Sequence, residues 1–155
     1  MAYRVLPFPL EVASHARATR SDLFGHEGLR PIRVDESPGY PCRVCLREAA
    51  VGDEVFLIAH RASSVGHPHS VVGPVYVHAH ACAPWADEGS LPPVARTRPM
   101  AVRAYDAGGD LIACELAEGP AVEAAIERLL EDSRAAALHL HFARAGCFAC
   151  RLERA

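Results

Sequence analysis

The sequence predicts an α+β domain, in which a mainly antiparallel sheet carries one principal helix packed on one face. The first observation is a hairpin: residues 100–107 and 110–116 are strand-like, and Gly108-Gly109 between them suits a two-residue turn. The second is an apolar stripe at the spacing of one helix face, formed by Val122, Ala125, Ile126, Leu129 and Leu130. A chain of 155 residues lies within the usual size of one domain, so we expect residues 1–155 to form a single domain.

The other elements follow from alternating apolar residues and from turn residues. We expect strands at residues 3–8, 31–34, 55–60, 74–80, 100–107, 110–116 and 138–142, which makes a sheet of about six to eight strands. The principal helix is expected at residues 120–131, with Pro120 in its first turn. Shorter helical pieces are expected at residues 9–17 and 21–24, the second capped by Ser21 or Asp22. Residues 62–70 read as a surface loop or, alternatively, as a lid over a site.

Composition excludes several classes of partner. The net charge is −3, so the chain has no overall basic character with which to bind nucleic acid. No apolar run approaches the roughly 20 residues of a membrane-spanning helix, and the first residues do not resemble a signal peptide. We therefore expect a cytoplasmic protein that binds neither nucleic acid nor membrane. In a reducing compartment, its six cysteines are better explained as metal ligands, redox groups or buried residues than as disulfides.

Two Cys-x-x-Cys pairs are the strongest chemical signal. Cys42 with Cys45 and Cys147 with Cys150 can each form a tight turn that presents two thiolates to a tetrahedral zinc ion. One zinc shared by the two pairs would tie the early part of the fold to its end. About a hundred residues lie between the pairs, whereas roughly 15–20 are typical of a zinc ribbon. The alternative is that Cys147 and Cys150 lie on a regular strand, where side chains three residues apart point to opposite faces.

A third cluster offers replacement ligands. His78, His80 and Cys82 alternate along the end of an expected strand and would share one of its faces. Cys82 is the first candidate to replace a member of either cysteine pair, and His78 or His80 is the next. A dithiol redox module is also compatible with Cys-x-x-Cys, but neither pair opens a helix in a βαβ context. Cys114 lies alone in an expected strand and is predicted to be a core residue.

A second candidate surface comes from the expected strand at residues 138–142. Its apolar residues alternate with His139 and His141, so the two histidines share one face. If the principal helix covers the opposite face, the histidines face a candidate working surface. The sequence therefore supports two functions: a zinc-stapled binding or structural protein, and a small metal- or thiol-dependent enzyme that uses His139 and His141. No catalytic residue, substrate or protein partner is identified by a reaction motif.

Several segments together resemble an uncharacterised bacterial family, domain of unknown function 1203. They are Gly39-Tyr40-Pro41-Cys42-Arg43, Gly73-Pro74-Val75-Tyr76-Val77, Val102-Arg103-Ala104-Tyr105-Asp106-Ala107, His139-Leu140-His141 and Gly146-Cys147-Phe148. The resemblance implies a single small α+β domain and no known activity. It also implies that many members carry Ser or Ala in place of Cys45 and Cys150. A function shared by the family would then rest on Cys42, Cys147, His139 and His141.

Overall fold

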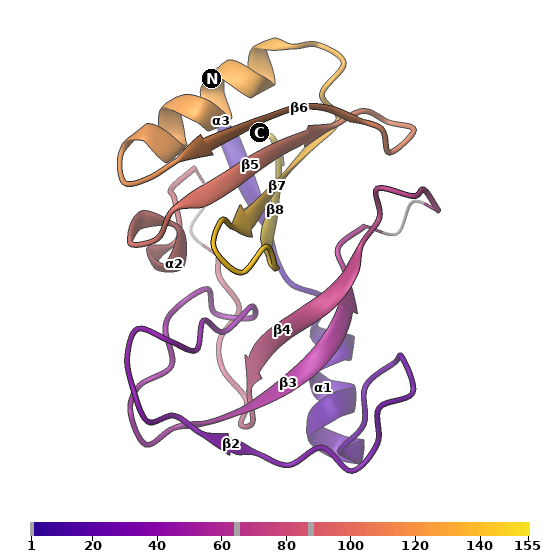
Figure 1. Cartoon of the computed structure of the whole chain (residues 1–155), viewed down its shortest axis with the longest axis vertical. Helices are drawn as coiled ribbons and strands as arrows, with labels where there is room; N and C mark the ends of the chain where they lie inside the picture. Colours follow the sequence, from indigo (N-terminus) through magenta and orange to yellow (C-terminus); the bar gives the residue numbers. More distant parts are fainter. Residues whose placement is uncertain (1, 64–65, 87–88) are drawn as a thin grey trace.

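The structure is a computed structural model that describes residues 2–63, 66–86 and 89–155. Within these residues the chain forms eight strands and three helices, shown in Figure 1. The strands are β1 (Tyr3–Leu6), β2 (Ile32–Arg33), β3 (Glu54–Arg61), β4 (Val72–His78), β5 (Met100–Tyr105), β6 (Leu111–Ala117), β7 (Ala137–Phe142) and β8 (Phe148–Arg154). The helices are α1 (Leu10–Thr19), α2 (Pro93–Arg96) and α3 (Ala121–Glu131). The α+β class and one principal helix are thus confirmed.

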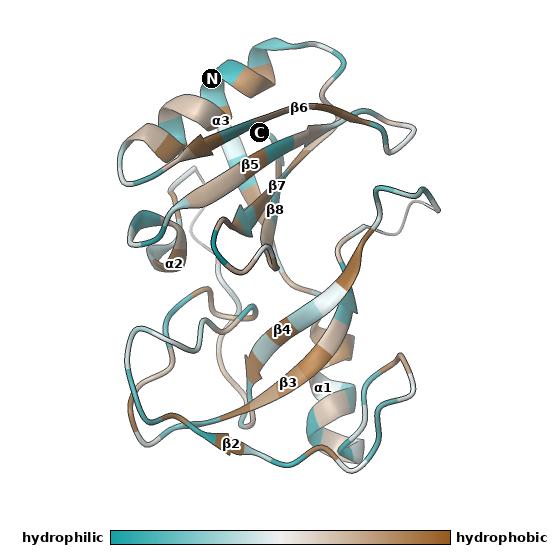
Figure 2. Ribbon diagram, in the orientation of Figure 1, coloured by the Kyte–Doolittle hydropathy of each residue, from teal (hydrophilic) through white to brown (hydrophobic). Residues whose placement is uncertain are grey.

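The larger sheet has five strands in the order β1-β8-β7-β5-β6, and every neighbouring pair is antiparallel. The β5–β6 hairpin confirms the turn predicted at Gly108-Gly109, although only Gly109 has a positive φ, of 94°. Helix α3 contacts β5, β6 and β7. All five residues of its predicted apolar stripe are buried, and Figure 2 shows hydrophilic residues between them along the helix.

A second sheet of three strands, in the order β2-β3-β4, lies apart from the first in Figure 1. The eight strands of the described residues therefore form two sheets, where the sequence predicted one. Helix α1 packs beside β3, and together they enclose a smaller core that contains Cys42 and Cys45. Because strand pairing between distant segments leaves little trace in local alternation, periodicity alone could not divide the strands between the sheets.

Three local predictions were wrong. Residues 21–24 form no helix; instead the Asp22 carboxylate accepts the backbone N–H groups of Phe24, His26 and Ala59 and so ties this loop to β3. Cys114 is exposed, because the adjacent Glu115 faces α3 through its ion pair with Arg128 and Cys114 therefore points to the opposite face of β6. The strand at residues 74–80 ends at His78, before His80.

The predicted loop at residues 62–70 connects β3 and β4, with residues 64–65 outside the described part of the chain. None of the helices in the described ranges has the length and apolar character needed to span a bilayer.

Candidate metal centre

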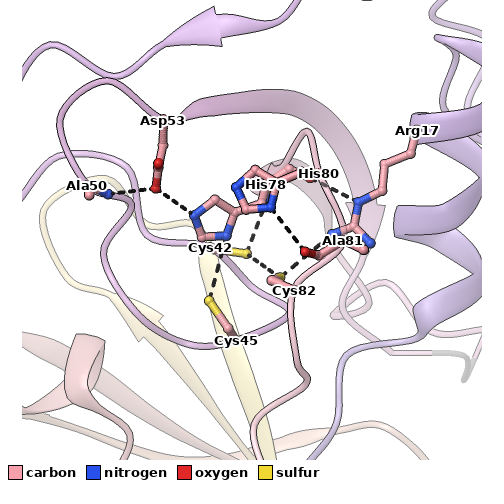
Figure 3. Close-up of polar contacts among 9 residues, drawn as sticks. All are labelled: Arg17, Cys42, Cys45, Ala50, Asp53, His78, His80, Ala81 and Cys82. Atoms are coloured by element: carbon pink, nitrogen blue, oxygen red, sulfur yellow. Dashed lines mark hydrogen bonds and ion pairs between the residues drawn. The ribbon is translucent and has the colours of Figure 1, made fainter.

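Three segments of the chain bring four potential metal ligands together beside the smaller sheet. Cys42 and Cys45 come from the turn between β2 and β3, His78 ends β4, and Cys82 follows a bend after it (Figure 3). One ligand atom from each of the four residues lies within 4.8 Å of all the others. The Sγ atoms of Cys42 and Cys82 are 3.8 Å apart, and Cys45 Sγ is 3.7 Å from His78 Nδ1. Ligands about 2.3 Å from a tetrahedral zinc lie about 3.8 Å apart, so this spacing suits a four-coordinate ion.

The Cys42–Cys45 pair is held in a tight turn by backbone hydrogen bonds. The Cys42 carbonyl accepts the Leu46 N–H at 2.9 Å, and the Cys42 N–H donates to the Arg47 carbonyl at 2.9 Å. Leu46 adopts a left-handed conformation with φ of 51°, which reverses the chain directly after Cys45. The backbone N–H of His78 also points at Cys42 Sγ, at 3.4 Å. Such N–H groups stabilise a thiolate at Cys42, which is the form that binds a metal.

His78 is oriented by a carboxylate on its far side. Its Nδ1 atom faces Cys45, while its Nε2 atom lies 3.3 Å from Asp53 Oδ2 (Figure 3). A carboxylate on the second ring nitrogen is the usual outer partner of a metal-bound histidine, because it sets the tautomer and the ring orientation. Asp53 was not predicted from the sequence as part of a site, because an isolated Gly-Asp pair shows no link to a histidine 25 residues later.

Arg17 on α1 approaches the cluster from the side opposite Asp53. Its Nε donates to the His78 carbonyl at 3.0 Å, and its Nη2 lies 3.7 Å from Cys82 Sγ. A divalent ion held by three thiolates and one neutral imidazole would have a net charge of about −1, which the Arg17 guanidinium would offset. Arg17 was not predicted from the sequence, because its contact depends on how α1 packs against the end of β4.

The electrostatics of the four residues favour deprotonation at one thiol. Hydrogen bonds from Cys45 and His78 lower the pKa of Cys42. The hydrogen bond that the Cys45 thiol donates to Cys42, together with burial, raises the pKa of Cys45. Burial and the nearby Cys42 charge raise the pKa of Cys82, while hydrogen bonding to Cys42 and then Asp53 raises that of His78. A bound cation would favour the deprotonated form at every one of these positions.

The second Cys-x-x-Cys pair does not join this cluster. Cys147 Sγ accepts a hydrogen bond from Arg43 Nη2 at 3.2 Å, and Cys150 lies in the core of the larger sheet. Burial raises the pKa of Cys150 to about 12, which disfavours the thiolate. Cys147 directly precedes β8 and Cys150 lies within it. This arrangement is closer to the alternative in which both cysteines lie on a strand than to a turn that presents two ligands. Neither belongs to a group of three potential ligands among the described residues.

His139 and His141 lie next to each other on β7, as predicted, but they do not face an open surface. They are 4% and 3% exposed, and their rings pack on Phe148. Burial lowers the pKa of His139 to about 3 and that of His141 to about 4, so both are neutral near pH 7. His141 Nδ1 lies 3.0 Å from the Gly146 carbonyl oxygen. Neither histidine joins a metal-ligand group in the described ranges.

Two further groups contain three potential ligands each. His80 is exposed, stacks on His78 with ring centroids 4.7 Å apart, and forms a group with His78 and Asp53. His67, His69 and Asp110 form the other at the surface. In the latter, His69 Nδ1 already accepts the Leu111 N–H at 3.0 Å. The cluster of Cys42, Cys45, His78 and Cys82 is therefore the most complete candidate metal centre in the described residues.

Comparison with known proteins places the chain in a family. The model of the family DUF1203, described as proteins of unknown function, matches residues 39–154. This range contains the four clustered ligands and Asp53, whereas Arg17 lies before it. No curated protein matches the sequence, and no solved structure matches the fold. Because the family model covers most of the sequence, the chain belongs to DUF1203.

Proposed function

We propose that Cys42, Cys45, Cys82 and His78 bind one zinc ion with a structural role, in a protein that serves as a binding or structural module. The observation that carries this proposal is the convergence of four soft or borderline ligand atoms, from three chain segments, within 4.8 Å of one another. Thiolate ligands favour zinc or iron over magnesium, calcium and manganese. A set of three sulfur atoms and one imidazole nitrogen in a tetrahedron is a common structural zinc site.

A structural role follows from the number of ligands and from their burial. Four protein ligands complete a tetrahedron and leave no position for water or substrate. Cys42, Cys45 and His78 are at most 8% exposed, so the ion would be shielded from solvent on most sides. The ion would join the turn before β3 to the end of β4 and to the segment that follows. Because such a site forms only in the folded chain, its binding free energy adds to folding stability.

The proposal is tested by elemental analysis of protein purified without added metal. We expect about one zinc per chain in the unmodified protein. Cys82→Ser and His78→Ala should each lose most of it, because three ligands hold zinc much more weakly than four.

Cys150→Ser is the matched control. The four-cysteine site predicted from sequence requires Cys150, whereas the proposed site does not. Retention of zinc by Cys150→Ser, together with its loss from Cys82→Ser, supports the proposed ligand set. The reverse pattern, or unmodified protein that folds without metal, would refute it.

A further inference from the structure

One cavity in the described part of the chain is lined by none of the four candidate metal ligands. It has a volume of about 420 Å³ and is bounded by residues 6–9, α1, the end of β3 and part of β8. It therefore lies between the two sheets, where the chain passes from β1 to α1. Its volume is within the range of sites that bind small molecules.

One side of this cavity is apolar. Phe8 and Val12 line it from the chain around the start of α1, and Leu23 and Phe24 line it from the loop after that helix. Leu23 and Phe24 are 56% and 41% exposed, although large apolar side chains next to each other are usually buried. The apolar body of a ligand would cover part of this surface.

The other side is cationic. Arg43, Arg61 and Arg151 line it, and no Asp or Glu occurs among the described lining residues, although Arg151 pairs with Glu153 at 2.8 Å. Arg43 is 2% exposed, and its side chain hydrogen-bonds the carbonyl oxygens of Phe148 and Pro41 and the Cys147 sulfur. In the described part of the chain, no carboxylate lies within ion-pair distance of its guanidinium. Three hydrogen bonds and the Phe142 ring, whose centroid lies 4.8 Å from the guanidinium carbon, already stabilise this charge, but none of these partners is a carboxylate. An anion in the cavity would supply the missing counter-charge.

His60 supplies a second polar group beside Arg43. It is 8% exposed and lines the cavity, with its ring packed between Phe8 and Phe148 at centroid distances of 4.6 and 5.7 Å. Its ring nitrogens make no hydrogen bond to any residue that the structure describes, and they are not among the fully enclosed polar atoms, so a ligand in the cavity can reach them. Burial and the nearby Arg43 charge lower the pKa of His60 to about 4, so a neutral imidazole can donate one hydrogen bond.

We propose that this cavity binds a small amphipathic acid, whose carboxylate meets Arg43 and His60 and whose apolar body lies against Phe8, Val12 and Phe24. A carboxylate can accept from a guanidinium and an imidazole together, and charge-assisted hydrogen bonds of this kind are about twice as strong as neutral ones. Neutral apolar molecules would leave the buried guanidinium without a counter-charge. The two proposed sites share no residue, although Arg43 lies between the zinc ligands Cys42 and Cys45. Metal content tests the zinc site and acid binding tests the cavity, so failure of one proposal can be told from failure of the other.

The test is calorimetric titration of the full-length protein with octanoate, octanol and octylammonium. Octanoate should bind, octanol should bind about tenfold more weakly because it lacks the charge, and octylammonium should not bind measurably. Equal affinity for octanoate and octanol, or no binding of octanoate, would overturn the proposal.

Two substitutions locate the site. Phe24→Asp places a negative charge on the apolar side and should weaken octanoate binding by about tenfold or more. Leu116→Asp is the matched control, because Leu116 is 79% exposed on β6 and lies outside the cavity lining. The Leu116→Asp protein should bind octanoate with unchanged affinity. Phe24 lies in an exposed loop, so its replacement tests the cavity without removing a core residue. Unchanged affinity in Phe24→Asp would place any bound acid elsewhere and contradict the proposal.

Discussion

Asp53 is the residue that links the candidate metal centre to the surrounding fold. Its Oδ2 atom lies 3.3 Å from His78 Nε2 and accepts the Ala50 N–H at 3.1 Å, so the turn before β3 and the histidine share one carboxylate oxygen. We predict that Asp53→Asn lowers zinc affinity by about tenfold, because outer partners of metal ligands typically contribute that much. Competition with a chromophoric chelator measures this affinity. Asp35→Asn, which changes an aspartate that hydrogen-bonds Tyr40 instead, should leave it unchanged.

The buried His139 should make the free energy of unfolding depend on pH in the acid range. Burial, followed by the nearby His141, lowers the pKa of His139 to about 3, against 6.5 for an unperturbed histidine. Between these two values the unfolded chain binds a proton that the folded chain does not, so acidification destabilises the fold. Each such histidine contributes about 1.4 kcal/mol of lost stability per pH unit below 6.5.

We therefore predict that His139→Phe reduces the fall in the free energy of unfolding between pH 6.5 and about 4, as measured by urea denaturation. Leu116→Phe on β6 is the control, because it changes an exposed residue and removes no titratable group, and it should keep the slope of the unmodified protein. An unchanged slope in His139→Phe would show that this residue is protonated in the fold.

Helices and strands could be predicted where the pattern that specifies them lies within one short segment of the sequence. The five apolar residues of α3 and the β5–β6 hairpin depend only on local spacing, and both were predicted correctly. The candidate site was predicted in part: Cys42, Cys45, Cys82 and His78 were all candidates, but Cys147 and Cys150 ranked above Cys82 and His78 because they repeat a motif. Tertiary structure determines which of these candidates come together, because the bend after His78 brings Cys82 back toward Cys42. No local pattern encodes that approach.

A substitution in helix α3 should change the stability of the larger sheet without changing metal binding. Ile126 is fully buried against that sheet, so Ile126→Ala should lower the free energy of unfolding by about 3 kcal/mol through lost burial and a new cavity. The zinc content per chain should not change, because the ligands belong to the other core. Loss of zinc from folded Ile126→Ala protein would contradict this separation.

At the scale of the whole molecule, the described residues form three hydrophobic clusters: a large one at the five-strand sheet, a second around α1, β3 and β4, and a small one of Val34, Ala49 and Val55. The proposed zinc belongs to the second cluster. The core of the larger sheet contains the α3 stripe, whereas Cys42 and Cys45 belong to the core of α1, β3 and β4. Arg43 connects the two parts by donating from the Cys42–Cys45 turn to the Phe148 carbonyl at 2.8 Å.

Removal of the metal should therefore affect the two sheets unequally. We predict that chelation accelerates amide hydrogen exchange in β3 and β4 while β5 and β7 keep most of their protection, because local stability follows the interactions of each cooperative unit. Mass spectrometry of peptides from the four strands reports this difference. Equal acceleration in all four strands would show that the sheets unfold together.

X-ray absorption spectroscopy at the zinc edge of the purified protein tests the central claim most directly, because it counts the ligands. We predict about three sulfur atoms at about 2.3 Å and one nitrogen atom at about 2.0–2.1 Å from the ion. Four sulfur atoms without nitrogen, or a shell of light atoms that includes water, would contradict the assignment of Cys42, Cys45, Cys82 and His78.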